Sequence, residues 1–195
     1  MNTTAIIILA IIIIAIAVGA FFYFRRRRSE NLRKQFGPEY KRAVKQHGDQ
    51  RKAEAELAER EKRVRKLEIR GLTRDEKNRF ADNWKKTQAH FVDAPSPAVS
   101  EAHGLVKELM LARRYPVGEF EQRAADISVD HPEVVNNYRN AHDIAERNKS
   151  GKATTEDLRQ AMVHYRSLFD ELLDTPAAEP STRSERTKTD KEAAK

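Results

Sequence analysis

Cysteine is absent from the 195 residues, which excludes disulfide frameworks, Cys-ligated zinc, iron–sulfur clusters and thiol nucleophiles. Glycine and proline are scarce, at seven residues each, so a collagen-like chain or a Gly/Ser linker is excluded as well. Hydrophobic residues make up 39% and aromatic residues 7%, so we expect one modest core at most. A mean hydropathy of -0.77 argues against a polytopic membrane protein.

One long hydrophobic run is nevertheless present near the N-terminus. Between Ala5 and Phe24, twenty consecutive residues carry no charge, and eight of them are Ile. At about 1.5 Å per residue, a helix of this length is roughly 30 Å long, which matches the hydrocarbon core of a bilayer. We therefore predict a transmembrane helix over residues 5–24. The alternative is a cleavable secretory signal, but the run is too long for one and its positive cluster follows it.

Four consecutive arginines after this run predict its orientation. Lys and Arg near a span stay on the cytoplasmic side, so we expect the N-terminus outside and residues 25–195 inside, in a single pass through the inner (cell) membrane. The aromatic residues before the arginines suit the headgroup level of the inner leaflet. The predicted membrane-anchor residues are therefore Phe21, Phe22, Tyr23, Phe24, Arg25, Arg26, Arg27 and Arg28.

The formal net charge of +7 is unevenly distributed along the chain. Residues 25–70 hold 17 basic and 8 acidic residues, whereas residues 71–174 hold 15 and 18. Basic residues close to an anionic leaflet contribute about 1 kcal/mol each, so we expect residues 25–70 to lie near the anionic inner leaflet of the bilayer. A solvated helix face is the alternative. Nucleic acid is not expected as a partner, because no basic patch interleaved with aromatic residues occurs.

Residues 25–70 are predicted to form a basic juxtamembrane helical arm. Gly37-Pro38 should interrupt a first helix, Gly48 should end a second, and residues 50–69 should form a third. The third has a thin apolar stripe in which Arg60 occupies a position that suits an apolar residue. This stripe favours a short coiled coil or stalk that could contact a protein partner or a second copy of the chain, although it covers fewer than three heptads.

Residues 71–174 are predicted to form a small cytoplasmic bundle of four principal helices. Three start signals support it, namely the capping boxes at 73–76 and 130–133, and Thr154 or Thr155 with Asp157. Alternating β-branched runs with hairpin turns do not occur, so the predicted fold class is all-α. Residues 175–195 have no apolar side chains other than Ala, and we expect a disordered tail.

No combination of ionisable residues predicts catalysis. The six histidines show no metal-binding spacing, and no P-loop, nucleophile elbow, dinucleotide fingerprint or EF-hand loop occurs. We therefore expect no enzyme and assign no catalytic, cofactor-binding or metal residues. The densest polar group is Tyr138, Arg139, His142 and Asp143, a weak candidate for a small-ligand site. The ordinary interpretation of His142 is a hydrogen-bonded structural histidine.

Several blocks of sequence resemble a family of uncharacterised bacterial single-pass membrane proteins. These blocks are FGPEY (36–40), LEIRGL (67–72), FVDAP (91–95), YPVGEFEQRAADISVDHP (115–132) and TEDLRQAMVHYRSLFDELL (155–173). The resemblance implies a bacterial source, a membrane location and a shared helical module, and it implies no activity. Two functions are compatible with the sequence: a membrane-tethered adaptor or scaffold, or a regulatory module that binds a small molecule in the bundle.

Overall fold

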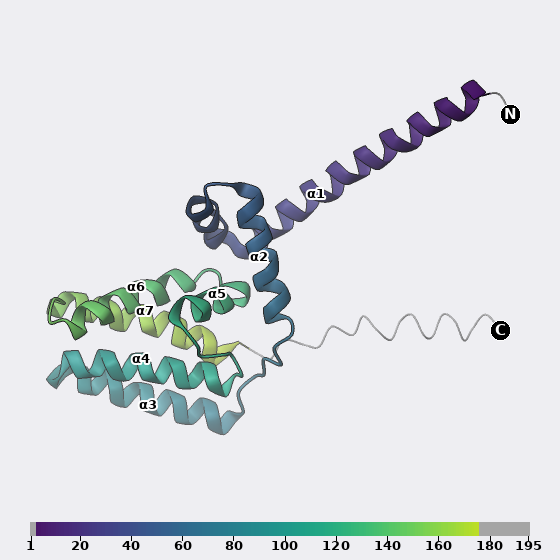
Figure 1. The fold of residues 1–195 in the computed structure, drawn as a ribbon. Coiled ribbons are helices and arrows are strands. Elements are labelled where there is room, and N and C mark those ends of the chain that lie inside the picture. The colour runs from purple at the N-terminus through teal and green to yellow at the C-terminus, as the bar shows by residue number, and fades with distance from the viewer. Residues whose placement is uncertain (1–2, 176–195) are drawn as a thin grey trace, which may run out of the picture. The chain divides into compact units, whose positions relative to one another are not determined.

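The computed structural model describes residues 3–175, and it describes side chains from residue 11 onward. The predicted disordered tail lies outside the described residues, apart from Thr175. The described part contains seven helices and no strands (Figure 1), which confirms the all-α class. They are α1 (Thr3–His47), α2 (Gln50–Val64), α3 (Arg74–Asp93), α4 (Pro95–Ala112), α5 (Phe120–Asp130), α6 (Val135–Lys149) and α7 (Thr155–Asp174).

The predicted span over residues 5–24 belongs to the first part of α1. Within the described part of the chain, no helix combines the length and the apolar composition that a membrane crossing requires. The side chains of residues 5–10, which include three of the eight Ile residues in the run, lie outside the described side chains. The fold therefore confirms the helical class and gives no support to the span itself.

The helices belong to two compact units. The arm unit holds α1, α2 and the segment Ala125–Val135. The bundle unit holds α3, α4, α6, α7 and the connecting residues between Arg65 and Ala124. The first half of α5 therefore belongs to the bundle unit and its second half to the arm unit.

Gly37 breaks the helical path of α1, as the sequence predicts. Its φ of 44° and ψ of -120° lie outside the helical region, and a Cβ added there would be 2.8 Å from Glu133 Oε1. Pro38 follows directly and cannot donate a backbone hydrogen bond to the preceding turn. The positive φ disfavours any side chain here, whereas the exposed end of Glu133 can move aside, so it is the backbone that favours glycine at this position.

The helix α2 turns back onto α1 after Gly48, whose φ is 65°. It ends at Val64, five residues before the predicted end at Ile69. The chain beyond it takes up an irregular connection, in which Arg70 N donates to Arg113 O at 3.1 Å. The apolar stripe is buried inside the arm unit, where Ala53, Leu57 and Val64 are at most 3% exposed.

Buried charges occupy the interior of the arm unit. Arg60 Nη1 donates to Glu39 Oε1 at 2.9 Å, and the side chains of Arg60 and Glu39 are 7% and 1% exposed. Arg60 Nε also donates to Glu56 at 2.8 Å. Arg63 Nη2 lies 2.7 Å from Oδ1 of Asp126, whose side chain is 1% exposed. The arginine in the apolar stripe therefore has two carboxylates as partners.

The bundle unit has an apolar core that its amphipathic helices share. The Trp84 ring on α3 stacks on the Phe169 ring on α7, with centroids 4.6 Å apart and an interplanar angle of 21°. The helix α4 packs against both α3 and α7, with Val106 and Leu109 fully buried. Complete capping boxes begin α3 at Thr73 and α7 at Thr154, and this confirms the two predicted starts.

The predicted capping box at 130–133 is wrong. Asp130 is the last residue of α5, and α6 begins only at Val135. His131 N donates to Ile127 O at 2.8 Å, so the backbone there still continues the α5 hydrogen-bond pattern. A helix that ends at the expected cap leaves no room for another to begin there.

Candidate functional site

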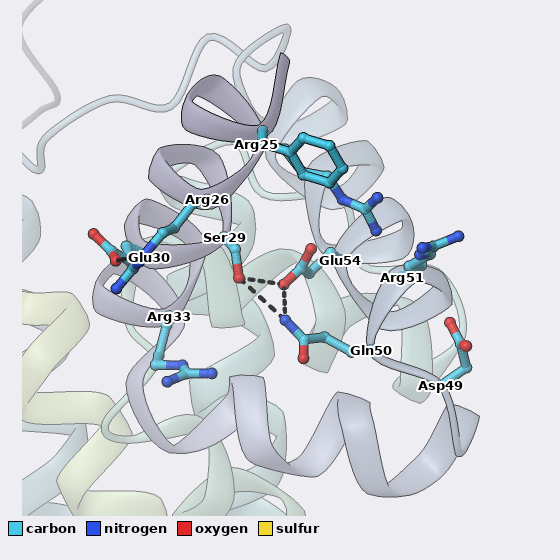
Figure 2. A pocket seen from close by; sticks show the side chains of 10 residues that line it. Arg25, Arg26, Ser29, Glu30, Arg33, Asp49, Gln50, Arg51 and Glu54 are labelled. Carbon is cyan, nitrogen blue, oxygen red and sulfur yellow. Dashed lines mark hydrogen bonds and ion pairs between the residues drawn. The ribbon is translucent and has the colours of Figure 1, made fainter. Parts of the chain in front are cut away.

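A crevice of about 650 Å³ lies between α1 and α2 in the arm unit (Figure 2). Its lining combines arginines, carboxylates, two neutral polar residues and one aromatic ring: Phe22, Arg25, Arg26, Ser29, Glu30, Arg33, Asp49, Gln50, Arg51 and Glu54. A second crevice of about 410 Å³ shares Arg25, Arg51 and Glu54 with the first. These three side chains therefore lie at the centre of the site.

Glu54 forms the floor of the crevice. Its Oε1 accepts hydrogen bonds from Ser29 Oγ at 2.5 Å, Tyr40 Oη at 2.7 Å and Gln50 Nε2 at 2.8 Å. Burial raises the pKa of the Glu54 carboxyl, but these donors and the charge of Arg25 outweigh it and hold the pKa below its usual value. Glu54 is therefore ionised at neutral pH, and one of its oxygens is fully used by the protein.

The other two carboxylates of the crevice also have donors within the chain. Glu30 accepts from Arg26 Nε at 3.2 Å. Asp49 Oδ1 accepts from Lys52 N at 2.9 Å at the start of α2, and this backbone hydrogen bond lowers the Asp49 pKa. The acidic residues thus serve structural contacts on the crevice walls.

Two arginines of the crevice have no such contacts. Among the described residues, Arg25 and Arg51 make no ion pair and no side-chain hydrogen bond, whereas Arg26 pairs with Glu30 and Arg33 lies 5.2 Å from the Tyr40 ring centroid. Arg25 comes from α1 and Arg51 from α2, so they approach the site from different helices. The lining holds four arginines and three carboxylates, so the crevice has a formal excess of one positive charge.

The predicted anchor residues all lie on α1, and several of them belong to this site. Phe21, Phe22, Tyr23 and Phe24 are each 60% exposed or more. The first crevice is lined by Phe22, Arg25 and Arg26, and the second by Phe21, Arg25 and Arg28. Arg27 lines neither. Sequence reasoning missed Ser29, Gln50, Arg51 and Glu54, because the return of α2 brings them together across more than twenty residues.

The predicted ligand residues of the bundle unit lie on α6 in different surroundings. Tyr138 is fully buried and its hydroxyl accepts from Arg123 Nε at 3.1 Å. The His142 ring stacks on Phe120 with centroids 3.6 Å apart. Arg139 is also buried, whereas Asp143 is exposed. The structure therefore brings Tyr138 and His142 together around Phe120, and Asp143 faces solvent.

A second histidine extends this aromatic cluster. His103 Nδ1 lies 2.9 Å from the Tyr165 hydroxyl, and the His103 and His142 ring centroids are 5.8 Å apart. Burial lowers the His103 pKa to about 4 and also lowers the His142 pKa, so both rings are neutral at pH 7. His142 Nδ1 is buried and makes no hydrogen bond. The described residues contain no group of three His, Asp or Glu placed to hold a metal ion.

No protein-family model, no curated protein and no solved structure matches this chain, so the interpretation of both sites depends on their own geometry.

Proposed function

We propose that the chain is a membrane-anchored helical adaptor or scaffold, in which residues 5–24 cross the inner membrane and the remainder is cytoplasmic. The observation that carries this proposal is the uncharged run, which continues within α1 directly into four arginines. The side chains of Ile11, Ile16 and Phe24 are 61%, 66% and 65% exposed. Exposed apolar surface costs about 25 cal/mol per Å² in water, and a lipid environment removes that cost.

Charge supports the proposed orientation and the role as a tether. The 17 basic residues within 25–70 follow the run, and several line the two crevices beside it. An anionic inner leaflet attracts such a segment, while the slightly acidic residues 71–174 have no comparable attraction to it. The bundle unit would then be free to meet a protein partner.

Carbonate extraction and cysteine labelling test this proposal. Because the chain has no cysteine, a single introduced one reports its position without background. We expect the chain to remain in the carbonate-washed membrane pellet. In intact cells, a membrane-impermeant thiol reagent should label Asn2→Cys and should spare Lys152→Cys until the cells are lysed. Labelling of Lys152→Cys in intact cells would contradict the orientation, and release by carbonate would contradict the span.

A small-ligand function for the bundle unit is the second candidate, and the buried His142 Nδ1 without a hydrogen bond favours it. The Glu146 Oε1 atom lies 3.9 Å from this nitrogen, too far for a hydrogen bond, so a polar ligand beside Tyr138 and Phe120 could supply one. A thermal-shift screen of metabolites on the full chain in mild detergent tests it, with His142→Phe as the comparison. A ligand that raises the melting temperature of the wild type and of His142→Phe equally would count against this site.

A further inference from the structure

We propose that the crevice between α1 and α2 binds one phosphate ester group between Arg25 and Arg51. The inference rests on the proposed function in naming the source of that group, the headgroup of an anionic phospholipid. The phosphate assignment itself depends only on the crevice.

The balance of charges in the crevice favours an anion. Glu30 is paired with Arg26, Asp49 caps the start of α2, and Glu54 accepts three hydrogen bonds on one oxygen. Among the described residues, Arg25 and Arg51 form no ion pair, although the charge of Arg25 acts on Glu54 and that of Arg51 on Asp49. An anionic group entering the site therefore meets two guanidinium groups whose charge no ion pair uses.

The residue types suit a phosphate in particular. A guanidinium group is planar and donates two parallel hydrogen bonds to two phosphate oxygens, and it stays charged at every physiological pH. Two such groups come from different helices, Arg25 from α1 and Arg51 from α2, and both line the same crevice (Figure 2). The Ser29 hydroxyl and the Gln50 amide beneath them add neutral polar surface.

The ring of Phe22 indicates an ester that carries an apolar part. Phe22 lines the same crevice as Arg25 and Arg51, and its side chain is 61% exposed. A volume of about 650 Å³ exceeds what a phosphate ion needs and leaves room for a glycerol moiety. Phe22 also lies within the last three residues of the uncharged run. In a chain anchored by that run, the crevice is at headgroup level, which favours a lipid over a soluble ester.

Native mass spectrometry of the full chain in mild detergent tests the site. The chain is titrated with phosphatidylglycerol, and separately with glycerol 3-phosphate. The test variant is Arg25→Gln/Arg51→Gln. The control is Arg27→Gln/Lys52→Gln, which removes the same charge from the same two helices at exposed positions outside both crevices. Far-UV circular dichroism monitors the folding of both variants, and Arg51→Gln alone provides a milder second variant.

We expect wild type and control to retain one phosphatidylglycerol molecule with similar affinity. The test variant should bind at least about tenfold more weakly than the control, since it loses the charge-assisted hydrogen bonds of two guanidinium groups. Equal affinities of the test and control variants would overturn the proposal. Binding of glycerol 3-phosphate alone, lost in the test variant, would support the phosphate site and assign it to a soluble ester.

The failure of this inference can be distinguished from the failure of the proposed function. If the chain resists carbonate extraction and both variants bind lipid equally, the membrane anchor is supported and the phosphate site is contradicted. If carbonate releases the chain but phosphate binding still needs Arg25 and Arg51, the phosphate site is supported and the membrane anchor is contradicted.

Discussion

The arm unit and the bundle unit are both helical and both bury apolar side chains, but they differ in where buried carboxylates lie. The interior of the bundle unit contains stacked rings and aliphatic side chains around Trp84 and Phe169. The interior of the arm unit contains the buried carboxylates of Glu39 and Asp126 and the buried guanidinium group of Arg60. Apolar packing tolerates many arrangements, whereas a buried ion pair is satisfied in few. Both units gain stability from apolar burial, and the buried ion pairs of the arm unit add a defined geometry to it.

Truncating the apolar core should have the largest effect. Phe169→Ala removes a ring that is 1% exposed and stacked on Trp84, and it should lower the free energy of unfolding by about 3–5 kcal/mol. Urea unfolding of the full chain in mild detergent, followed by the fluorescence of its single tryptophan, measures this. The control Val163→Ala lies on the same helix at a half-exposed site and should change stability by less than about 0.5 kcal/mol. Similar losses in both variants would contradict an apolar core at Phe169.

Removing a buried charge should have the next largest effect, and in the other unit. Arg60→Met deprives the buried Glu39 carboxylate of this cation, which should cost about 3 kcal/mol. Faster amide hydrogen exchange in α2, with the Trp84 fluorescence transition unchanged, is the expected observation. Arg60→Met/Glu39→Met should regain much of the loss, because the buried Glu39 carboxylate is then absent and the remaining partner of Arg60, Glu56, is 34% exposed. If the double variant is less stable than Arg60→Met, the unpaired Glu39 charge is not the cause of the stability loss.

Mild acid should lower the stability of the bundle unit before it affects that of the arm unit. His103 has its pKa lowered to about 4 by burial, then by the charges of His142 and Arg123, so the unfolded chain takes up more protons than the native state between about pH 6.5 and 4. The bundle's stability should therefore fall by roughly 1–2 kcal/mol as the pH drops through that window, given the partial exposure of His103. Tryptophan fluorescence against pH measures it, and His103→Gln should flatten the curve.

The arm unit should respond to acid only at lower pH. Burial raises the Glu56 pKa, but the hydrogen bonds and charge of Arg60 outweigh it, so the net shift is downward from 4.5. A carboxyl with a lowered native pKa adds stability above its unfolded pKa and loses it as the pH falls below that value. The protection factors of the α2 amides, in which the intrinsic pH dependence of exchange is divided out, should therefore stay constant from pH 6.5 to about 5. An arm that loosens in step with the bundle would contradict this difference.

The smallest expected effect concerns the break in α1. Gly37→Ala adds a Cβ at a φ of 44° and 2.8 Å from Glu133 Oε1, and it should destabilise the arm unit by about 1–2 kcal/mol. Gly104→Ala in α4 is the matched control, because nothing lies within 4 Å of its added Cβ. It should leave the bundle unchanged or stabilise it by up to about 1 kcal/mol. Hydrogen exchange for the arm and tryptophan fluorescence for the bundle make the comparison.

Local signals in the sequence predicted the ends and breaks of helices better than the contacts between distant residues. The capping boxes at Thr73 and Thr154 and the break at Gly37 depend on neighbouring residues, and the structure confirms them. The false start at Asp130 had the right residue types, but α5 already extends through that residue. Arg60 was recognised as out of place in its stripe, yet its partner Glu39 lies 21 residues away.

The candidate site could be predicted only in part, for the same reason. On the α1 side of the crevice, Phe22 belongs to the uncharged run and Arg25 is the first of the four arginines, so both are conspicuous in the sequence. The opposite wall, with Arg51 and Glu54, faces them only because Gly48 allows the chain to turn back. The periodicity of apolar residues along a helix does not predict which residues of two helices meet across such a turn.

The pair of Glu39 and Arg60 also determines the reach of the chain. In one continuous helix these residues, 21 positions apart, would be separated by about 30 Å, yet here Arg60 Nη1 and Glu39 Oε1 are 2.9 Å apart. The pair can therefore form only while α2 is folded back on α1. The same segment would reach further as a straight stalk than as the folded arm, and the buried ion pair stabilises the folded arm.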